Sequence, residues 1–315
     1  MSGFRHIPVM PEEVIASLRI RPEGTYLDGT AGGGGHSELI AKQLSGEGRL
    51  YCLDQDEDAV KAAGERLKPY GDRVKVIRGN FADAAAILDG EGAGLLDGVL
   101  LDLGVSSHQL DTPERGFSYM ADAELDMRMD QRSLLSAKRI VNEYSEEELA
   151  RILREYGEER YAKRIAGQIV SARQEKRIER TLELSELIER AVPADYRRSG
   201  GHPAMRTFQA LRIEANQELS VLERALEDLI ERLSAGGRIA VISFHSLEDR
   251  IVKNIFRRAE HPCTCPPDFP VCICGKKPKG RSVNRKPILP GEKEIRENSR
   301  AHSAKLRVFE RIRGE

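Results

Sequence analysis

The first third of the chain alternates short apolar runs with stretches of helical periodicity. Each apolar run is bounded by glycine or polar residues, and the segments between the runs carry apolar residues at intervals of three and four. Alternation of this kind is typical of parallel strands joined by helices that cross over the sheet. The expected strands are residues 26–30, 50–55, 74–79 and 99–105, and the expected helices are residues 37–44 and 58–67.

Two more strands are expected later in the chain, over residues 238–244 and 305–312. The first of them follows the glycine pair Gly236 and Gly237, which marks a turn. We expect both strands to complete the sheet that the first third of the chain begins. The predicted fold class is therefore α/β, with a doubly wound, Rossmann-like sheet.

A helical segment separates the two parts of this sheet. Residues 145–192 show helical periodicity throughout, and Ser145 with Glu148 forms a capping box. Glycines and a proline within residues 197–203 predict a hinge at which the chain returns. The apolar stripe over residues 208–233 then predicts one long helix. We expect a sheet domain formed by residues 1–111 and 206–315, and an inserted all-helical domain formed by residues 112–205.

The composition is that of a globular chain without a membrane span. The 315 residues are 40% hydrophobic and 32% charged, which suits roughly two domains and excludes a disordered chain. Apolar runs such as residues 239–244 fall far short of the ~20 residues that a membrane helix needs. Residues 1–14 contain no apolar region like that of a secretory signal, so we expect a cytoplasmic protein.

The charge is distributed unevenly along the chain. Residues 1–130 hold 23 acidic and 13 basic side chains, whereas residues 131–315 hold 28 acidic and 37 basic ones. Residues 250–290 are the most basic stretch, with ten lysines and arginines against Glu260 and Asp268. Such a block suits a polyphosphate partner, and a solvated basic surface is the alternative.

A glycine-rich turn follows the first expected strand. Residues 28–36 (DGTAGGGGH) end that strand and open a helix, where backbone N–H groups are unpaired and glycine allows a ligand to approach closely. The glycines do not give the Gly-x-Gly-x-x-Gly spacing of dinucleotide sites, and no phosphate-loop lysine follows them. Because Asp28 would repel a pyrophosphate but attract an α-amino group, a nucleotide that bears a cationic amino acid fits better.

Two more carboxylates are expected at the same edge of the sheet. Asp54 ends the second strand, where it can accept hydrogen bonds from both ribose hydroxyls of an adenosine, so turn and carboxylate together predict S-adenosylmethionine. The alternative to a ribose contact is that Asp54 belongs to an acidic run that only begins a helix. Asp102 ends a further strand, and residues 243–246 (SFHS) follow another one. A carboxylate in an apolar strand is costly unless a cation or donors meet it. The alternative is a helix or turn cap formed by Asp102, Ser106 or Ser107.

Four of the five cysteines are candidate metal ligands. Cys52 stands alone, whereas the other four form two Cys-x-Cys pairs within one short stretch. Four thiols in a reducing compartment can bind zinc, but zinc sites usually have two residues between paired cysteines. Reduced cysteines in a proline-rich loop are the alternative, and we assign no metal to the site. The pairs are Cys263 with Cys265 and Cys272 with Cys274.

Six long and chemically distinctive strings are spread along the whole chain. They are residues 28–36, 101–107 (LDLGVSS), 115–130 (RGFSYMADAELDMRMD), 156–164 (YGEERYAKR), 202–213 (HPAMRTFQALRI) and 243–253 (SFHSLEDRIVK). Together these strings resemble the RsmH/MraW family. The resemblance implies an S-adenosylmethionine-dependent methyltransferase sheet interrupted by a helical insertion that recognises substrate. It also implies methylation of N4 of a cytidine in the decoding region of 16S ribosomal RNA, the small-subunit RNA.

The resemblance also implies a set of cofactor contacts. The sequence departs from amino-methyltransferases in general at one point. Those enzymes hold the target amine with an Asp/Asn/Ser-Pro-Pro-aromatic tetrapeptide. Residues 102–105 are Asp-Leu-Gly-Val instead, so the catalytic geometry cannot be copied from the DNA enzymes. The cofactor contacts that the family implies are Gly34, Gly35, His36, Asp54, Phe81, Asp102 and Gln109.

The chemistry of the implied reaction suggests catalytic residues. The cytosine amine is a poor nucleophile, so the protein must align it, remove water and take up a proton. Asp102 is the first candidate acceptor, and Ser106 and His245 are the second candidates.

The implied partner is small-subunit ribosomal RNA, either naked or within the assembled small ribosomal subunit. Its target base must be unstacked to be reached. Phosphate contacts are expected from residues 250–290 and from Arg160, Lys163 and Arg164 of the insertion. A homodimer is left open. Two other classes of protein are alternatives to a methyltransferase. They are a nicotinamide- or flavin-dependent oxidoreductase and a non-catalytic RNA-binding module that retains a nucleotide pocket.

Overall fold

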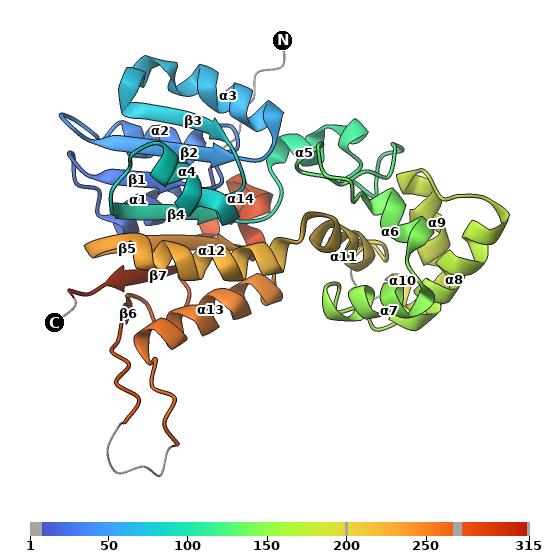
Figure 1. Cartoon of the computed structure of the whole chain (residues 1–315). Coiled ribbons are helices and arrows are strands. Elements are labelled where there is room, and N and C mark those ends of the chain that lie inside the picture. The colour runs from blue at the N-terminus through green and yellow to red at the C-terminus, as the bar shows by residue number, and fades with distance from the viewer. Residues whose placement is uncertain (1–7, 199–200, 267–272, 314–315) are drawn as a thin grey trace. The chain divides into compact units, whose positions relative to one another are not determined.

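The computed structural model describes residues 8–198, 201–266 and 273–313 (Figure 1). The chain forms two compact units. The first unit holds the residues up to Gly104 and those from Leu219 onward, and the second unit is Val105–Glu218. One segment of the chain is thus inserted between the two parts of the first unit.

The first unit is built on a seven-stranded sheet with the order β3-β2-β1-β4-β5-β7-β6. Neighbouring strands from β3 to β5 are parallel, whereas β7 is antiparallel to both β5 and β6. The expected doubly wound α/β fold is thereby confirmed, although the short strand β6 had not been expected. The strands are β1 Thr25–Asp28, β2 Arg49–Asp54, β3 Val74–Arg78, β4 Leu96–Asp102, β5 Leu233–Ser243, β6 Gly280–Ser282 and β7 Lys305–Arg311.

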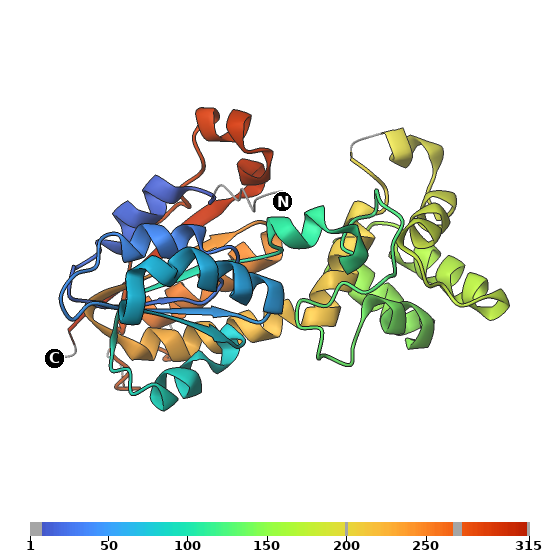
Figure 2. The same cartoon turned by 90° about the horizontal axis from the view of Figure 1, so that it is seen from above.

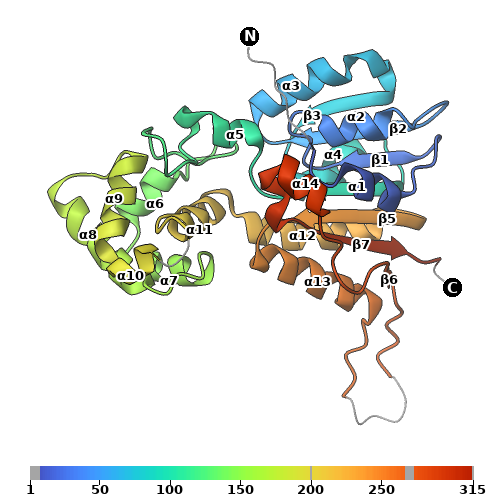
Figure 3. The same ribbon diagram turned by 180° about the vertical axis from the view of Figure 1, so that it is seen from behind.

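Helices cover both faces of this sheet because successive strand residues point to opposite sides. Tyr26 of β1 is buried in a core shared with α1, α2 and α3 (Figure 3), whereas its neighbour Leu27 is buried in a core shared with α4, α12 and α13 (Figure 1). These helices are α1 Pro11–Leu18, α2 Gly35–Ala41, α3 Glu57–Leu67, α4 Ala84–Gly90, α12 Glu218–Arg232 and α13 Ser246–Glu260, and α14 Glu292–Glu297 precedes β7.

The second unit has a core of its own, which its helices enclose (Figure 2). Leu149, Ile152 and Leu153 form the apolar face of the expected capped helix, and they pack with Ile165 and Ile169. The capping box of Ser145 and Glu148 is present. The helices are α5 Ser107–Asp111, α6 Ala137–Glu143, α7 Glu146–Glu155, α8 Ala162–Glu175, α9 Thr181–Ala191, α10 Ala194–Arg198 and α11 Met205–Asn216.

The expectation of one long helix over residues 208–233 was wrong. Helix α11 ends at Asn216, Gln217 takes a left-handed conformation with φ 52°, and α12 begins at Glu218. The Asn216 amide explains the break: it donates to the carbonyl oxygen of Met127 (2.8 Å) and accepts from the N–H of Met129 (2.7 Å). Gly200, at the expected return hinge, lies outside the described residues.

In residues 8–198, 201–266 and 273–313, no helix is both long enough and apolar enough to span a bilayer.

Candidate active site

Three aspartates end three neighbouring parallel strands. Asp28 ends β1, Asp54 ends β2 and Asp102 ends β4, and the strand register sets Asp28 beside Cys52 and Leu100. The carboxyl ends of parallel strands meet at one edge of a sheet, which is where such folds bind ligands. The expected gathering of these carboxylates at one edge is therefore present.

Asp54 holds the glycine turn in place. Its Oδ2 accepts a hydrogen bond from the N–H of Gly32 (2.8 Å), and its Oδ1 accepts one from the N–H of Asp56 (2.9 Å). Burial raises the pKa of Asp54 to about 6, and these two backbone donors act in the opposite direction. The carboxylate thus fixes the turn on β1 from the neighbouring strand.

The glycines of the turn serve two different purposes. Gly34 has φ 76° and precedes α2, and a Cβ there would lie 3.3 Å from both Ala63 Cα and Arg66 Cδ. Gly29 instead makes room for apolar neighbours, since its Cβ would lie 2.5 Å from Leu101 Cδ2 and 3.0 Å from Phe81 Cβ. Only glycine is therefore accommodated at either position without strain or displacement.

Asp28 has a different role from the one expected. We expected its carboxylate to attract an α-amino group, but it is only 1% exposed and its two oxygens bind the turn. Oδ2 accepts from the hydroxyl of Ser37 (2.6 Å), and Oδ1 accepts from the N–H of Thr30 (3.1 Å). Burial raises the pKa of Asp28 to about 6. Sequence reasoning missed Ser37, although a hydroxyl residue in the first turn of a helix after a glycine loop is a recognisable pattern.

Asp102 is the least satisfied polar group at this edge. Its backbone N–H donates to Thr30 Oγ1 (2.6 Å), and its Oδ2 lies 3.5 Å from His36 Nδ1. Its Oδ1 is buried and has no hydrogen-bond partner among the described residues. Burial, followed by the nearby charges of Asp28 and Glu248, raises the pKa of Asp102 well above its ordinary value.

His36 is buried beside Asp102. Its Nε2 lies 2.8 Å from the carbonyl oxygen of Val9, and only 5% of the residue is exposed. Burial lowers the pKa of His36 to about 4, so the ring is neutral at pH 7 and offers Asp102 no positive charge. In the parts of the chain that the structure describes, no lysine or arginine forms an ion pair with Asp28, Asp54 or Asp102.

His245 lies at the start of α13, just beyond the end of β5. It caps the helix: its Nδ1 accepts from the N–H of Glu248 (3.4 Å), and Glu248 Oε2 accepts in return from the N–H of His245 (3.2 Å). The Nε2 atom is buried and makes no hydrogen bond in the described structure, although Glu248 Oε1 lies 3.2 Å away. Strand β5 sets Ile242 beside Asp102, so the backbone around His245 follows the same edge of the sheet. Sequence reasoning overlooked Glu248, which the capping-box spacing from His245 could have indicated.

Ser106 and Gln109 belong to the second unit, where they begin α5. Ser106 Oγ accepts from the N–H of Gln109 (3.2 Å), and Gln109 Oε1 accepts from the N–H of Ser106 (3.0 Å). The pair thus forms a capping box, and Gln109 is 4% exposed. In this structure Ser106 therefore caps a helix, which was the alternative to a catalytic role.

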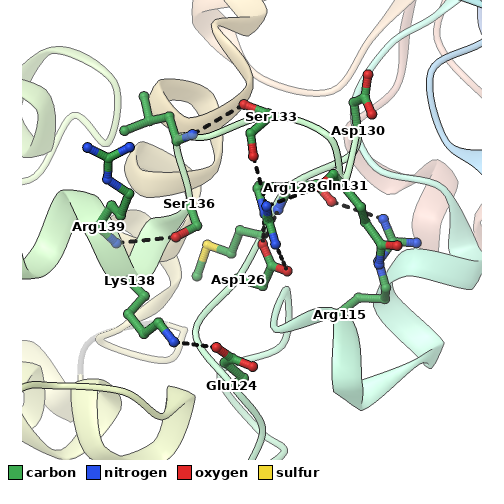
Figure 4. Close-up of polar contacts among 12 residues, drawn as sticks. Arg115, Glu124, Asp126, Arg128, Asp130, Gln131, Ser133, Ser136, Lys138 and Arg139 are labelled. Atoms are coloured by element: carbon green, nitrogen blue, oxygen red, sulfur yellow. Dashed lines mark hydrogen bonds and ion pairs between the residues drawn. The ribbon is translucent and has the colours of Figure 1, made fainter.

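The string at residues 115–130 forms a polar framework in the second unit (Figure 4). Arg128 binds Asp126 through Nη2 and Oδ2 (2.9 Å) and donates through Nη1 to the carbonyl oxygen of Ser133 (2.8 Å). Arg115 in turn donates to the carbonyl oxygen of Arg128 (2.9 Å). These charged side chains use their hydrogen bonds to shape a loop, which gives them a structural role.

The edge fits a ligand that is cationic and rich in hydrogen-bond donors. A buried carboxyl oxygen without a partner is costly, and so are several buried carboxylates without a counter-charge. S-adenosylmethionine carries an ammonium group, a positively charged sulfonium and two ribose hydroxyls. These groups match an edge where, among the described residues, the carboxylates have no counter-charge and Asp102 Oδ1 has no donor.

A parallel sheet with this turn and these carboxylates defines a class: the Rossmann-like methyltransferases that use S-adenosylmethionine. Residues 3–312 match the sequence model of the MraW methylase family. The chain therefore belongs to the MraW methylase family, which confirms the resemblance of its motifs and sets aside the oxidoreductase alternative.

Two curated relatives of similar length agree with this assignment. The chain is 58% identical to the "Ribosomal RNA small subunit methyltransferase H" of Lachnospira eligens, over 98% of each chain. It is 59% identical to the "Ribosomal RNA small subunit methyltransferase H 2" of Agathobacter rectalis, again over 98% of each. Among solved structures, an rRNA methylase from Streptococcus thermophilus aligns with 99% of this chain and 100% of its own, with a TM-score of 0.44 and 11% identity.

Proposed function

We propose that this chain transfers a methyl group from S-adenosylmethionine to N4 of a cytidine in the decoding region of 16S ribosomal RNA. The observation that carries the proposal is the acidic edge of the sheet, where Asp102 keeps a buried oxygen without a partner beside a neutral His36. The choice of substrate rests on the family and on the names of the curated relatives.

The cofactor is proposed to lie along the glycine turn. Asp54 would meet the ribose hydroxyls, the half-buried ring of Phe81 would meet the adenine, and Asp102 would meet the methionine end. The bound cofactor supplies an electrophilic methyl group on its sulfonium. The proposed contacts in full are Gly34, Gly35, His36, Asp54, Phe81, Asp102 and Gln109.

The residues at the edge would handle the proton of the amine. The amine loses one N–H proton as its nitrogen gains the methyl group, so a base must take up that proton. We assign this role to Asp102, whose Oδ1 is available to accept it. His245 and Ser106 are the second candidates, His245 as a base through Nε2 and Ser106 as a hydrogen-bond acceptor that aligns the amine. The raised pKa of Asp102 makes its carboxylate a stronger base than an exposed aspartate.

Exposed basic residues on each unit are proposed to contact the RNA backbone. In the first unit, a pocket beside α13 is lined by Lys253, Arg257 and Arg285, which are exposed. In the second unit, Lys163 and Arg164 are exposed at the start of α8. We propose that the helical insertion, residues 112–205, recognises the substrate, with Arg160 as a further contact. The partner would be naked ribosomal RNA or the assembled small subunit in the cytoplasm, and a homodimer is compatible with this role.

Mass mapping of ribosomal RNA tests this proposal. Nucleosides from cells with and without the protein are compared, and we expect N4-methylation of one decoding-region cytidine to disappear without it. Purified protein with S-adenosylmethionine should restore the modification, on naked RNA or on isolated small subunits. An unchanged cytidine in the deleted strain, together with no transfer in vitro to either substrate, would overturn the proposal. Calorimetry with S-adenosylmethionine, and with NAD as the control, distinguishes an enzyme from an RNA-binding module without cofactor.

A further inference from the structure

Three cysteine sulfurs converge in the arm that joins α13 to β6, a segment that the proposed methyl transfer does not use. The Sγ atoms of Cys263, Cys265 and Cys274 all lie within 4.8 Å of one another, and those of Cys263 and Cys274 are 3.8 Å apart. All three are thiols, since a disulfide would hold its sulfurs about 2.05 Å apart. Cys272 lies outside the described residues.

This spacing matches the ligands of a tetrahedral metal ion. Zinc binds thiolate sulfur at about 2.3 Å, and two ligands of a tetrahedral site are then about 3.8 Å apart. The distance between Cys263 and Cys274 has this value, although the two residues are 11 positions apart in the sequence. Sulfurs from two stretches of the arm, residues 263–265 and residue 274, are thus placed where one ion would hold them.

Apolar packing does not explain why the sulfurs meet. Cys263 is exposed, and the side chain next to Cys274, Ile273, is 74% exposed. The apolar clusters of the described structure include no residue between 262 and 279. A short segment without a core commonly obtains its order from a metal or a disulfide, and no disulfide joins these sulfurs.

A backbone donor and two lysines accompany the sulfurs. The N–H of Ile273 points at Cys265 Sγ over 3.4 Å, and a donor in this position stabilises a negatively charged sulfur ligand. Lys276 and Lys277 follow directly in the sequence and are exposed, so positive charge lies near the cluster.

We propose that Cys263, Cys265 and Cys274 bind one Zn²⁺ ion, with a fourth ligand completing the tetrahedron. Each thiol releases its proton as it binds, and no redox step is involved. The ion is structural: it links residues 263–265 to residue 274 and fixes the segment that carries Lys276 and Lys277. This proposal departs from our sequence-based assignment, which contained no metal, because the structure brings the sulfurs into one cluster.

Metal analysis of the purified full chain tests the site. We expect about one zinc ion per chain in the wild type and in the control Thr264→Ala, whose residue lies between two of the ligands. Cys263→Ser and Cys274→Ser should each lose the ion. Zinc-free wild-type protein that also fails to take up added zinc would overturn the proposal, and so would serine variants that retain it.

Cobalt and trypsin provide readouts that do not depend on methyl transfer. Cobalt added to metal-free wild-type protein should give the intense ultraviolet absorption of cobalt–thiolate bonds and the visible spectrum of a tetrahedral ion, both absent from Cys263→Ser. Removing zinc with a chelator should speed tryptic cleavage after Lys276 in the wild type and change nothing in Cys263→Ser. A cobalt spectrum without thiolate bands would refute thiolate ligation. If zinc binds while the ribosomal RNA is unaffected, the metal site stands and the proposed methyl transfer fails.

Discussion

His36 and Asp102 face each other at the carboxyl edge of the sheet, with 3.5 Å between imidazole Nδ1 and carboxyl Oδ2. The other ring nitrogen, Nε2, lies 2.8 Å from the carbonyl oxygen of Val9. A carbonyl only accepts hydrogen bonds, so Nε2 carries the proton and Nδ1 of the neutral ring is an acceptor. Nδ1 can accept a hydrogen bond from the Asp102 carboxyl group only when that group is protonated. Burial favours this protonated form, because it raises the pKa of Asp102. Both the burial of Asp102 and the acceptor on His36 therefore favour the protonated form of this carboxyl group when no ligand is bound.

His36 is expected to stay neutral down to about pH 4. Burial lowers its pKa from 6.5 to about 4, whereas the ring of the unfolded chain takes up a proton near 6.5. The unfolded state then binds more protons, so the stabilising contribution of His36 is complete above pH 6.5 and is lost as the pH falls through 4. The loss amounts to about 3 kcal/mol of the free energy of unfolding. Nitrogen NMR of labelled histidine should show the Nε2–H tautomer at pH 7, and a ring that is charged at pH 6 would contradict the prediction.

Asp102→Asn should stabilise the ligand-free protein at high pH. Because the folded-state pKa of Asp102 is raised, its stabilising protonated form is present at low pH and is lost as the pH rises through that value. Asparagine is neutral at every pH, and its amide can donate to His36 Nδ1. We expect the stability advantage of the variant to grow as the pH rises above about 4, the ordinary pKa of an aspartate, so its free energy of unfolding is compared with that of the wild type by urea titration at pH 4 and pH 9. A difference that does not change with pH would refute the argument.

The same substitution is expected to remove catalysis. An amide cannot take the proton of the amine, so Asp102→Asn should lower kcat by about 10²–10⁴-fold at saturating S-adenosylmethionine, and Asp102→Ala should abolish transfer. Asp72→Asn, at an exposed aspartate, is the control and should keep the activity of the wild type. Methyl incorporation into small-subunit RNA measures the effect. Near-normal turnover of either Asp102 variant would remove this residue from the mechanism.

Gly34→Ala should disrupt the turn. The left-handed backbone at Gly34 (φ 76°) costs a residue with a Cβ about 1–2 kcal/mol, and the new methyl group would press on Ala63. We expect lower stability and cofactor affinity weakened at least about tenfold, because the turn forms the proposed cofactor site. Gly64→Ala is the matched control: a Cβ there meets nothing within 4 Å, so helix α3 should become slightly more stable. Equal effects of the two variants on cofactor binding would contradict the prediction.

Hydrophobic patterning predicted the sheet because every strand of its parallel part is an apolar run. Leu50, Leu53 and Leu100 are all buried in strands that the pattern marked. The same patterning failed at Gln217, because the apolar stripe continues through the break between the two helices. The break is set by Asn216, which forms hydrogen bonds with a loop about 90 residues earlier in the chain. Long-range contacts of this kind leave no mark in local periodicity.

The sequence predicted part of the candidate site, as it predicted part of the fold. Strand-end positions identified Asp54 and Asp102, because topology alone brings such residues to one edge. The role of Asp28 depends on the Ser37 hydroxyl reaching back across the turn, which spacing does not reveal. The absence of a counter-charge for Asp102 was equally invisible, because it follows from His36 being buried against Val9.

Charge reversal at the pocket beside α13 should weaken RNA binding and reduce its salt dependence. Lys253 and Arg257 are exposed there, and the structure pairs neither with a described acidic side chain. If each neutralises one phosphate, the double variant Lys253→Glu/Arg257→Glu should lower the slope of log affinity against log salt by about two. Lys293→Glu, an exposed lysine on α14, is the control and should leave the slope unchanged. Filter binding of a small-subunit RNA fragment across a salt series measures both. Equal slopes for wild type and double variant would show that these cations only solvate the surface, because counterion release must fall with every phosphate contact that is lost.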